Sequence, residues 1–428
     1  MYKRQHDGQP ADPNRNAGVV NFDLGLLKAQ PIPPASGSYA GLTVANNYAG
    51  ALPAGIVRRP KNCQDSTCAP DFDFAPRLGF AWQPLASNDR LVVRGGYGIF
   101  YNIVQGVPFA IGETAVAPTG EGIIYTGTSN ALATLQVPFN PVPPLGFSSD
   151  ERTLTSQISQ SSVAYNLRTP YTMTYNADVQ WEFKPSWVAD IGYVGSNSHN
   201  LETAGTYNEP LLASPTDPVN CGDPLTGCIT TNTAGNAAER VPYVGFVPTG
   251  LTINGNIGAF EYNALQATLR TPSFHGLLFQ ASYTWARDFT NVAGVDLSAG
   301  GAGSVRSNDP NNLRQQWGLA DYTRPQRFVV SYTYDLPAHG NGRFVGKALS
   351  GWSVAGVTVI QDGLPMTLTD STGGAVYGFA GASRAQLCPG FTVGGIENPG
   401  SVKSRLNSFF DLDSVADTSA GALSLIHI

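Results

Sequence analysis

Five cysteines are the residues of this 428-residue sequence with the most distinctive chemistry. They fall as the close pairs Cys63/Cys68 and Cys221/Cys228 and as the single Cys388. Both pairs lie in segments rich in proline, asparagine, aspartate and glycine, where neighbouring thiols can close a small disulfide ring in an oxidising compartment. The alternative is a metal site with four thiolate ligands, but neither spacing is Cys-x-x-Cys and no histidine lies nearby. The spacing therefore favours the disulfides Cys63–Cys68 and Cys221–Cys228, and we expect no metal and no other cofactor.

The run Arg94-Gly95-Gly96-Tyr97-Gly98 has the composition of a phosphate-binding glycine loop. It lies within an expected strand and opens no helix, which argues against phosphate binding. Glycine on such a strand instead leaves room for large neighbouring aromatic side chains or for curvature. The five histidines are scattered, and the sequence contains neither a Gly-x-Ser-x-Gly elbow nor a metalloprotease helix motif. We therefore expect that the protein is not an enzyme.

Polar side chains that alternate with apolar ones form the other candidate functional set. From Tyr171 to Phe183 every odd position is apolar or aromatic and every even position is polar. Successive side chains of a β-strand point to opposite faces, so this strand lies between two different solvents. On the polar side we expect a wet barrel lumen, with generic lining favoured over specific solute contact. The candidate lumen-facing residues are Asp178, Gln180, Glu182, Asp190, Gln280 and Asp288.

The length and the ends of this strand predict that it crosses a membrane. Its length is close to the roughly 9–11 residues that a tilted strand needs to cross the hydrocarbon core. Aromatic residues lie toward both ends of its apolar side, as in the interfacial girdles of outer-membrane barrels. The residues 184–186 then turn the chain, and 187–196 run back to complete a hairpin.

Three more hairpins are expected, and the lengths of their connections are segregated. The expected strands are 72–82 with 91–101, 262–270 with 277–289, and 328–336 with 352–361, with weaker candidates at 41–45 and 364–369. Short turns join the strands within each hairpin, whereas the long connections 104–170, 202–256 and 290–325 join one hairpin to the next. Outer-membrane barrels have short periplasmic turns and long extracellular loops. The predicted fold is therefore all-β, a partial antiparallel transmembrane β-barrel.

The composition agrees with this prediction but does not require it. Charged residues make up 13% of the chain, about half the share of a soluble domain. No run of 18 apolar residues occurs, so no transmembrane helix is expected. A secreted β-sandwich would have the same average hydropathy. The net charge of −6 argues against nucleic acid as a partner.

Three regions follow from these patterns: a loop-rich part at 1–71, barrel strands and loops at 72–370, and an irregular region with a truncated barrel at 371–428. The residues 1–16 lack the apolar core of a signal peptide, and 423–428 lack the pattern of an aromatic-ended final barrel strand. The strings MYKRQ and LSLIHI resemble translated sequencing-adapter sequence. We therefore expect an internal fragment of a longer barrel protein.

Several segments resemble the barrel of the Oar-like branch of TonB-dependent outer-membrane receptors. They occur in the family's order and cover most of the chain, and their specificity lies in the series. The segments are 74–82 (FAPRLGFAW), 92–101 (VVRGGYGIFY), 191–196 (IGYVGS), 262–266 (YNALQ), 281–285 (ASYTW), 326–332 (QRFVVSY) and 349–352 (LSGW).

This resemblance implies a barrel in the outer membrane of a Gram-negative bacterium that moves a bulky solute and is surrounded by outer-membrane lipid. Energy would come from TonB through a plug domain that is not visible in this sequence, so the fragment alone would be inactive. Plugged transporters have about 22 strands, more than twice the number expected here. Two alternatives stay open: a passive porin-like or autotransporter-like barrel, and a secreted soluble β-rich adhesion or carbohydrate-binding protein.

Overall fold

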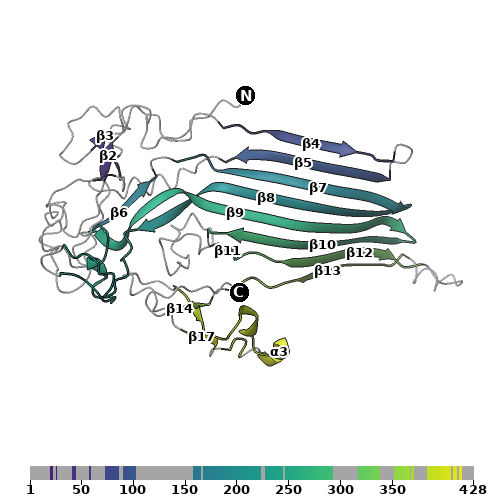
Figure 1. Cartoon of the computed structure of the whole chain (residues 1–428). Helices are drawn as coiled ribbons and strands as arrows, with labels where there is room; N and C mark the ends of the chain where they lie inside the picture. Colours follow the sequence, from purple (N-terminus) through teal and green to yellow (C-terminus); the bar gives the residue numbers. More distant parts are fainter. Residues whose placement is uncertain are drawn as a thin grey trace, which may run out of the picture.

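A computed structural model describes the parts of the chain that form the fold (Figure 1). The described residues are 73–85, 90–102, 158–164, 167–222, 227–243, 246–292, 317–337, 351–366, 368–370, 383–405, 408–411 and 414–416, with short pieces at 20–22, 26, 41–44 and 57–58. Among them, no helix is both long enough and apolar enough to span a membrane.

One large antiparallel sheet dominates these residues. Its main path runs β13-β12-β10-β9-β8-β7-β5-β4, so neighbours in the sheet are also successive hairpin strands. The strands are β4 (Arg77–Trp82), β5 (Leu91–Tyr101), β7 (Tyr171–Lys184), β8 (Trp187–Tyr207), β9 (Phe246–Phe274), β10 (Leu277–Thr290), β12 (Gln326–Asp335) and β13 (Ser353–Gln361). Within the described residues β4 and β13 are the two edges and do not pair with each other, so the sheet is open.

Short turns and long connections lie at opposite ends of this sheet, as the sequence predicts (Figure 1). At the short-turn end β7 passes to β8 through Pro185 and Ser186, and β9 passes to β10 through His275 and Gly276. The predicted turn 271–276 is therefore too long. His275 and Gly276 both have positive φ, 51° and 81°, as a two-residue hairpin turn requires, so β9 continues to Phe274.

At the other end, β8 and β9 extend well beyond the predicted strand limits. Tyr207 still pairs with Leu251, many residues past the apolar alternation that marks the two strands in the sequence. This extension is rich in glycine, asparagine and threonine. It lacks the alternation of apolar and polar residues from which a strand is predicted. β6 (Ile158–Val163) pairs in parallel with the start of β9, inside a segment predicted to be a long connection.

A small packed lobe, formed by residues 208–222 and 227–243, lies between the extended ends of β8 and β9 in the chain. Ala213, Val219 and Ile229 form its buried apolar cluster, and η3 (Ala237–Glu239) lies close to β9. The remaining elements are short: β1 (Val20–Phe22), β2 (Leu42–Val44), β3 (Val57–Arg58), β11 (Gly318–Leu319), β14 (Thr369–Asp370), β15 (Ser383–Arg384), β16 (Gln386–Leu387), η7 (Val393–Gly395), α3 (Val402–Arg405) and β17 (Val415–Ala416). The weak strand predicted at 364–369 is reduced to the two residues of β14.

Candidate functional site

The register of the sheet divides its side chains into two faces. Residues directly opposite each other in an antiparallel pair point to the same side. Val179 pairs with Val93 and Ile191, and Ile191 pairs with Ala267, so these residues define what we call the apolar face. Residues one position away, such as Gln180, point to the other side, which we call the polar face.

The apolar face is uncovered among the described residues. Ile191 is 55% exposed, Trp181 52% and Trp285 50%, and each lies in the middle part of the sheet rather than at an edge. In a soluble β-sandwich this face would be packed against a second sheet. Extensive exposure of large apolar side chains instead indicates a surface that meets lipid or another apolar partner.

Aromatic side chains border the apolar face at both ends. At the short-turn end Trp181, Phe183, Trp187 and Phe274 follow one another with ring centroids 5.7, 6.4 and 5.7 Å apart. At the other end the ring centroid of Tyr171 lies 5.7 Å from that of Tyr101 and 5.2 Å from that of His199. These are the positions expected for the two interfacial girdles of a membrane barrel.

The distance between the girdles fits a bilayer. Tyr171 and Trp181, one from each girdle, stand ten residues apart on β7, which is about 33 Å at roughly 3.3 Å per residue. A strand tilt of about 40° reduces this to roughly 25 Å along the membrane normal, the height of the apolar band of outer-membrane barrels.

The polar face carries every candidate lumen-facing residue of the sequence. Asp178, Gln180 and Glu182 lie on β7, and Asp190 lies directly opposite Gln180 on β8. Asp190 also pairs with Thr268 on β9, which in turn pairs with Ser282 on β10. Gln280 and Asp288 are an even number of residues from Ser282 on β10, so they point to the same side. One surface therefore holds all six, Asp178, Gln180, Glu182, Asp190, Gln280 and Asp288.

Arg94 links two of these residues. Its guanidinium donates a hydrogen bond of 3.1 Å from Nη1 to Oε1 of Gln180, and the same nitrogen lies 4.0 Å from a carboxylate oxygen of Asp178. The Arg94 side chain remains about half exposed, so its charge stays accessible from the polar face. This contact places a cation, a carboxylate and an amide together, a combination suited to hydrated polar solutes.

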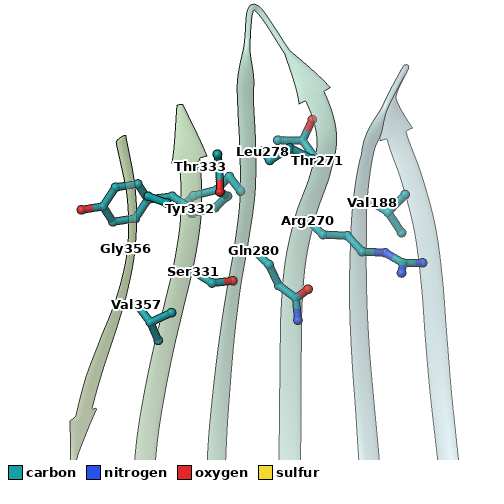
Figure 2. Close-up of a pocket in the computed structure, with 12 residues that line it drawn as sticks. Val188, Arg270, Thr271, Leu278, Gln280, Ser331, Tyr332, Thr333, Gly356 and Val357 are labelled. Carbon is teal, nitrogen blue, oxygen red and sulfur yellow. The ribbon is translucent and has the colours of Figure 1, made fainter. Parts of the chain in front are cut away.

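A hollow of about 720 Å³ lies on the polar face near the short-turn end (Figure 2). Arg270 and Gln280, on neighbouring strands, are directly opposite each other and line it together with Ser331 and Thr333. Val188 and Val357 add apolar sides (Figure 2). Of the candidate lumen-facing residues only Gln280 lines this hollow, so the structure does not gather the six into one pocket.

Asp288 lies apart from the others, at the loop end of β10. It is only 8% exposed, and its Oδ1 has no hydrogen-bond partner among the described residues. Its backbone carbonyl accepts a 3.0 Å hydrogen bond from the amide of Ala320, so the segment around β11 covers it. Asp288 is therefore a shielded carboxylate rather than an open part of the polar face.

The cysteine predictions fall partly within the described residues. Cys221 and Cys228 form a disulfide that closes a ring in the lobe, beside the backbone bridge between Val219 and Ile229. Cys63 and Cys68 lie outside the described residues, and Cys388 is a half-buried free thiol. In the part of the chain that the structure describes, no three His, Cys, Asp or Glu side chains group as metal ligands.

The lobe contains a residue that no sequence pattern singled out. Arg240 is fully buried, and its guanidinium donates hydrogen bonds to Oδ1 of Asn236 at 2.8 Å and to the backbone carbonyls of Leu211 and Thr233. These bonds tie three parts of the lobe to one side chain. At the end of β8, where the chain enters the lobe, partial burial raises the pKa of the Tyr207 phenol above its ordinary value of 10.0.

A family model described as an outer membrane beta barrel domain matches residues 7–424. Among solved structures, the outer membrane transporter YddB from Escherichia coli is 12% identical, with a TM-score of 0.37 and coverage of 73% of this chain and 32% of its own. The ferric enterobactin receptor PfeA from Pseudomonas aeruginosa is 11% identical, with a TM-score of 0.29 and coverage of 62% and 26%.

The alcaligin outer membrane receptor FauA from Bordetella pertussis is 12% identical, with a TM-score of 0.26 and coverage of 68% of this chain and 29% of its own. The chain thus spans about a third or less of the length of these solved proteins. No curated protein sequence matches it significantly. The family assignment rests on the family model alone.

Proposed function

The chain belongs to the outer membrane beta barrel domain family, and from this premise we propose that its sheet is part of the barrel of a TonB-dependent receptor of the Oar-like branch. The family places the protein in the outer membrane of a Gram-negative bacterium. In this proposal the apolar face of the sheet is in contact with lipid. In the proposed function the barrel moves a bulky polar solute across that membrane, and it performs no catalysis.

The observation that carries the proposal is the separation of the two faces. An exposed apolar band between aromatic girdles lies on one side of the sheet, and charged and amide side chains lie on the other. A closed sheet with this arrangement encloses a wet conduit, because barrel interiors are polar. Arg94 with Asp178 and Gln180, and Arg270 with Gln280, supply hydrogen-bond donors and acceptors along the conduit.

Energy coupling through TonB is supported by the series of sequence segments that resemble the Oar-like barrels. In the proposal a plug domain outside this chain occupies the lumen and contacts TonB. The first test is the coding sequence that flanks this chain in its source genome. A plug domain upstream supports the proposal, and a complete reading frame without one contradicts energy coupling.

The second test measures uptake with the complete gene. Cells that carry the gene and cells that lack it are supplied with labelled peptides, oligosaccharides and iron chelates, with and without a protonophore that removes the inner-membrane energy source. We expect one solute class to accumulate only when the gene is present and the inner membrane is energised. If the solute accumulates equally with and without the protonophore, the protein is a passive, porin-like barrel instead.

A further inference from the structure

Polar and charged side chains replace apolar ones on the apolar face near the loop end of β8, β9 and β10. Asn197 is directly opposite Glu261, and Asn263 pairs with both Gly195 and Arg287. These positions continue the same face as Ile191, Ala267 and Ala281. Four polar or charged side chains, Asn197, Glu261, Asn263 and Arg287, therefore lie on the side of the sheet that meets lipid.

Asn263 organises this cluster by hydrogen bonds. Its Oδ1 accepts from the phenol of Tyr175 at 3.0 Å and from the phenol of Tyr193 at 2.6 Å. Its Nδ2 donates to Oε1 of Glu261 at 2.7 Å. The rings of Tyr175 and Tyr193 are stacked with centroids 6.3 Å apart. The cluster is therefore fixed in place by its own contacts, which lowers the cost of ordering it around a ligand.

The height of the cluster is that of the membrane interface. Asn263 is only two residues along β9 from Leu265, which is 39% exposed on the same face. Toward the loops, the girdle of Tyr171 and His199 borders the same face. Polar groups that face hydrocarbon without partners cost several kcal/mol each, whereas tyrosine is favoured at the headgroup level. The cluster therefore faces lipid headgroups of the leaflet on the loop side.

The chemistry of the cluster specifies which headgroup fits. The carboxylate of Glu261 accepts hydrogen bonds and donates none, so it requires a ligand with hydroxyl or amide donors. The exposed guanidinium of Arg287, directly opposite Asn263, donates and never accepts, and it suits the oxygen atoms of a phosphate. A phosphate alone would satisfy Arg287 and be repelled by Glu261. A sugar that carries a phosphate satisfies both.

We propose that Tyr175, Tyr193, Glu261, Asn263 and Arg287 form an external binding site for the phosphorylated sugar headgroup of a glycolipid in the leaflet on the loop side. Arg287 contacts the phosphate, and Glu261 with the tyrosine phenols contacts sugar hydroxyls. The site lies on the opposite side of the sheet from the polar conduit, so it does not depend on the transported solute or on TonB.

The test uses the full-length protein purified from outer membranes in a non-ionic detergent. Its affinity is measured by native mass spectrometry and by intrinsic fluorescence for micelle-bound diphosphoryl lipid A, monophosphoryl lipid A and phosphatidic acid. We expect diphosphoryl lipid A to bind at least about ten-fold more tightly than phosphatidic acid, because only the former offers sugar hydroxyl donors beside its phosphate groups.

Single-residue variants test whether binding of diphosphoryl lipid A depends on the cluster. Arg287→Gln is expected to lower the affinity for diphosphoryl lipid A about ten-fold. Glu261→Gln is expected to reduce the preference for diphosphoryl lipid A over phosphatidic acid. The matched control is Arg327→Gln, which removes the same charge from the polar face, since Arg327 pairs with Thr284. Tyr175→Phe keeps the ring and removes only the hydroxyl, so it provides a second test in a barrel that remains folded.

Equal affinity for all three lipids would overturn the proposal. So would an equal loss from Arg287→Gln and Arg327→Gln, because general electrostatic attraction would then account for binding. If Arg287→Gln fails to fold, judged by loss of heat-modifiable migration, the outcome rests on Tyr175→Phe. That variant must weaken diphosphoryl lipid A several-fold, and unchanged affinity would contradict the site.

Discussion

The ring of Tyr175 lies across the backbone of Gly195 on the neighbouring strand. A Cβ atom added to Gly195 would stand 2.1 Å from Cε2 and 2.4 Å from Cζ of that ring, closer than any real contact. The missing side chain allows the phenol to cross β8 and reach Asn263 on β9. Phe80 over Gly95 and Tyr332 over Gly356 repeat the arrangement on the same face. Aromatic cover of strand glycines is thus a recurrent packing device in this sheet.

Gly195→Ala is expected to destabilise the barrel by about 1–3 kcal/mol, because the new methyl group displaces the Tyr175 ring from its packed position. The measurement is the unfolding midpoint in urea, followed by tryptophan fluorescence in lipid vesicles. Gly79→Ala is the matched control, since an added Cβ there meets only a backbone oxygen of Gly95 at 3.7 Å. In a Tyr175→Ala background the cost of Gly195→Ala should largely disappear, and a fully additive double variant would contradict the packing argument.

Leu265 and Gln266 are neighbours on β9 that point to opposite faces, and both are exposed. Leu265→Arg places a charge in the apolar band, two residues from the interfacial cluster at Asn263, and is expected to cost about 2 kcal/mol, the lower end of the range for this band. Gln266→Arg places the same charge on the wet polar face and should change stability by less than about 1 kcal/mol. Refolding titrations into lipid vesicles measure both. Equal costs would show that the two faces do not meet different solvents.

The transmembrane part of the fold could be predicted because its signal is local. The period-two alternation of β7 fixes its two faces, and register then transfers the same division to β5, β8 and β10. The candidate residues Asp178, Gln180, Glu182, Asp190, Gln280 and Asp288 accordingly lie on one face. The glycines of the Arg94–Gly98 run lie in β5, and Gly95 is covered by an aromatic ring, as the sequence predicts.

What could not be predicted depends on contacts between distant segments. The extension of β8 and β9 is held by backbone pairing between residues without apolar alternation, such as Thr203 with Gly255. The burial of Asp288 results from the β11 segment, which lies beyond a long connection. Arg240 is buried because carbonyl groups of Leu211 and Thr233 converge on it, and no spacing in the sequence indicates that convergence.

Removal of the Cys221–Cys228 disulfide is expected to loosen the lobe and leave the barrel strands intact. The bond spans a sequence separation of 7, for which loop-closure entropy gives about 2.5 kcal/mol of stabilisation. Cys221→Ser with Cys228→Ser should increase protease cleavage within the lobe without changing heat-modifiable migration of the barrel. Cys388→Ser is the control and should leave both measurements unchanged. Cleavage that spreads into β7 or β10 would contradict the separation of lobe and sheet.

Arg240→Lys tests whether the planar guanidinium, rather than its charge, holds the lobe together. Lysine keeps the charge but cannot reach Asn236, Leu211 and Thr233 at once, so buried carbonyl groups lose their donors. We expect a local loss of about 2–3 kcal/mol, measured as faster amide hydrogen exchange within residues 208–243. Exchange in β7 should not change, and Arg168→Lys, at an exposed position near β7, is the control.

The half-buried phenol of Tyr207, at the end of β8 where the lobe begins, should make the stability of the lobe depend on alkaline pH. Its pKa in the folded protein is raised above the ordinary value of 10.0 by burial. Between these two pKa values the unfolded chain has released a proton that the folded chain still holds, so stability decreases as pH increases through this window and is unaffected below it. Amide hydrogen exchange of the lobe, corrected for the intrinsic pH dependence of exchange, measures the change. Tyr207→Phe removes the phenol and should remove this part of the alkaline loss. If the variant loses stability above pH 10 as steeply as the parent, another group is responsible and the burial of Tyr207 does not control the lobe.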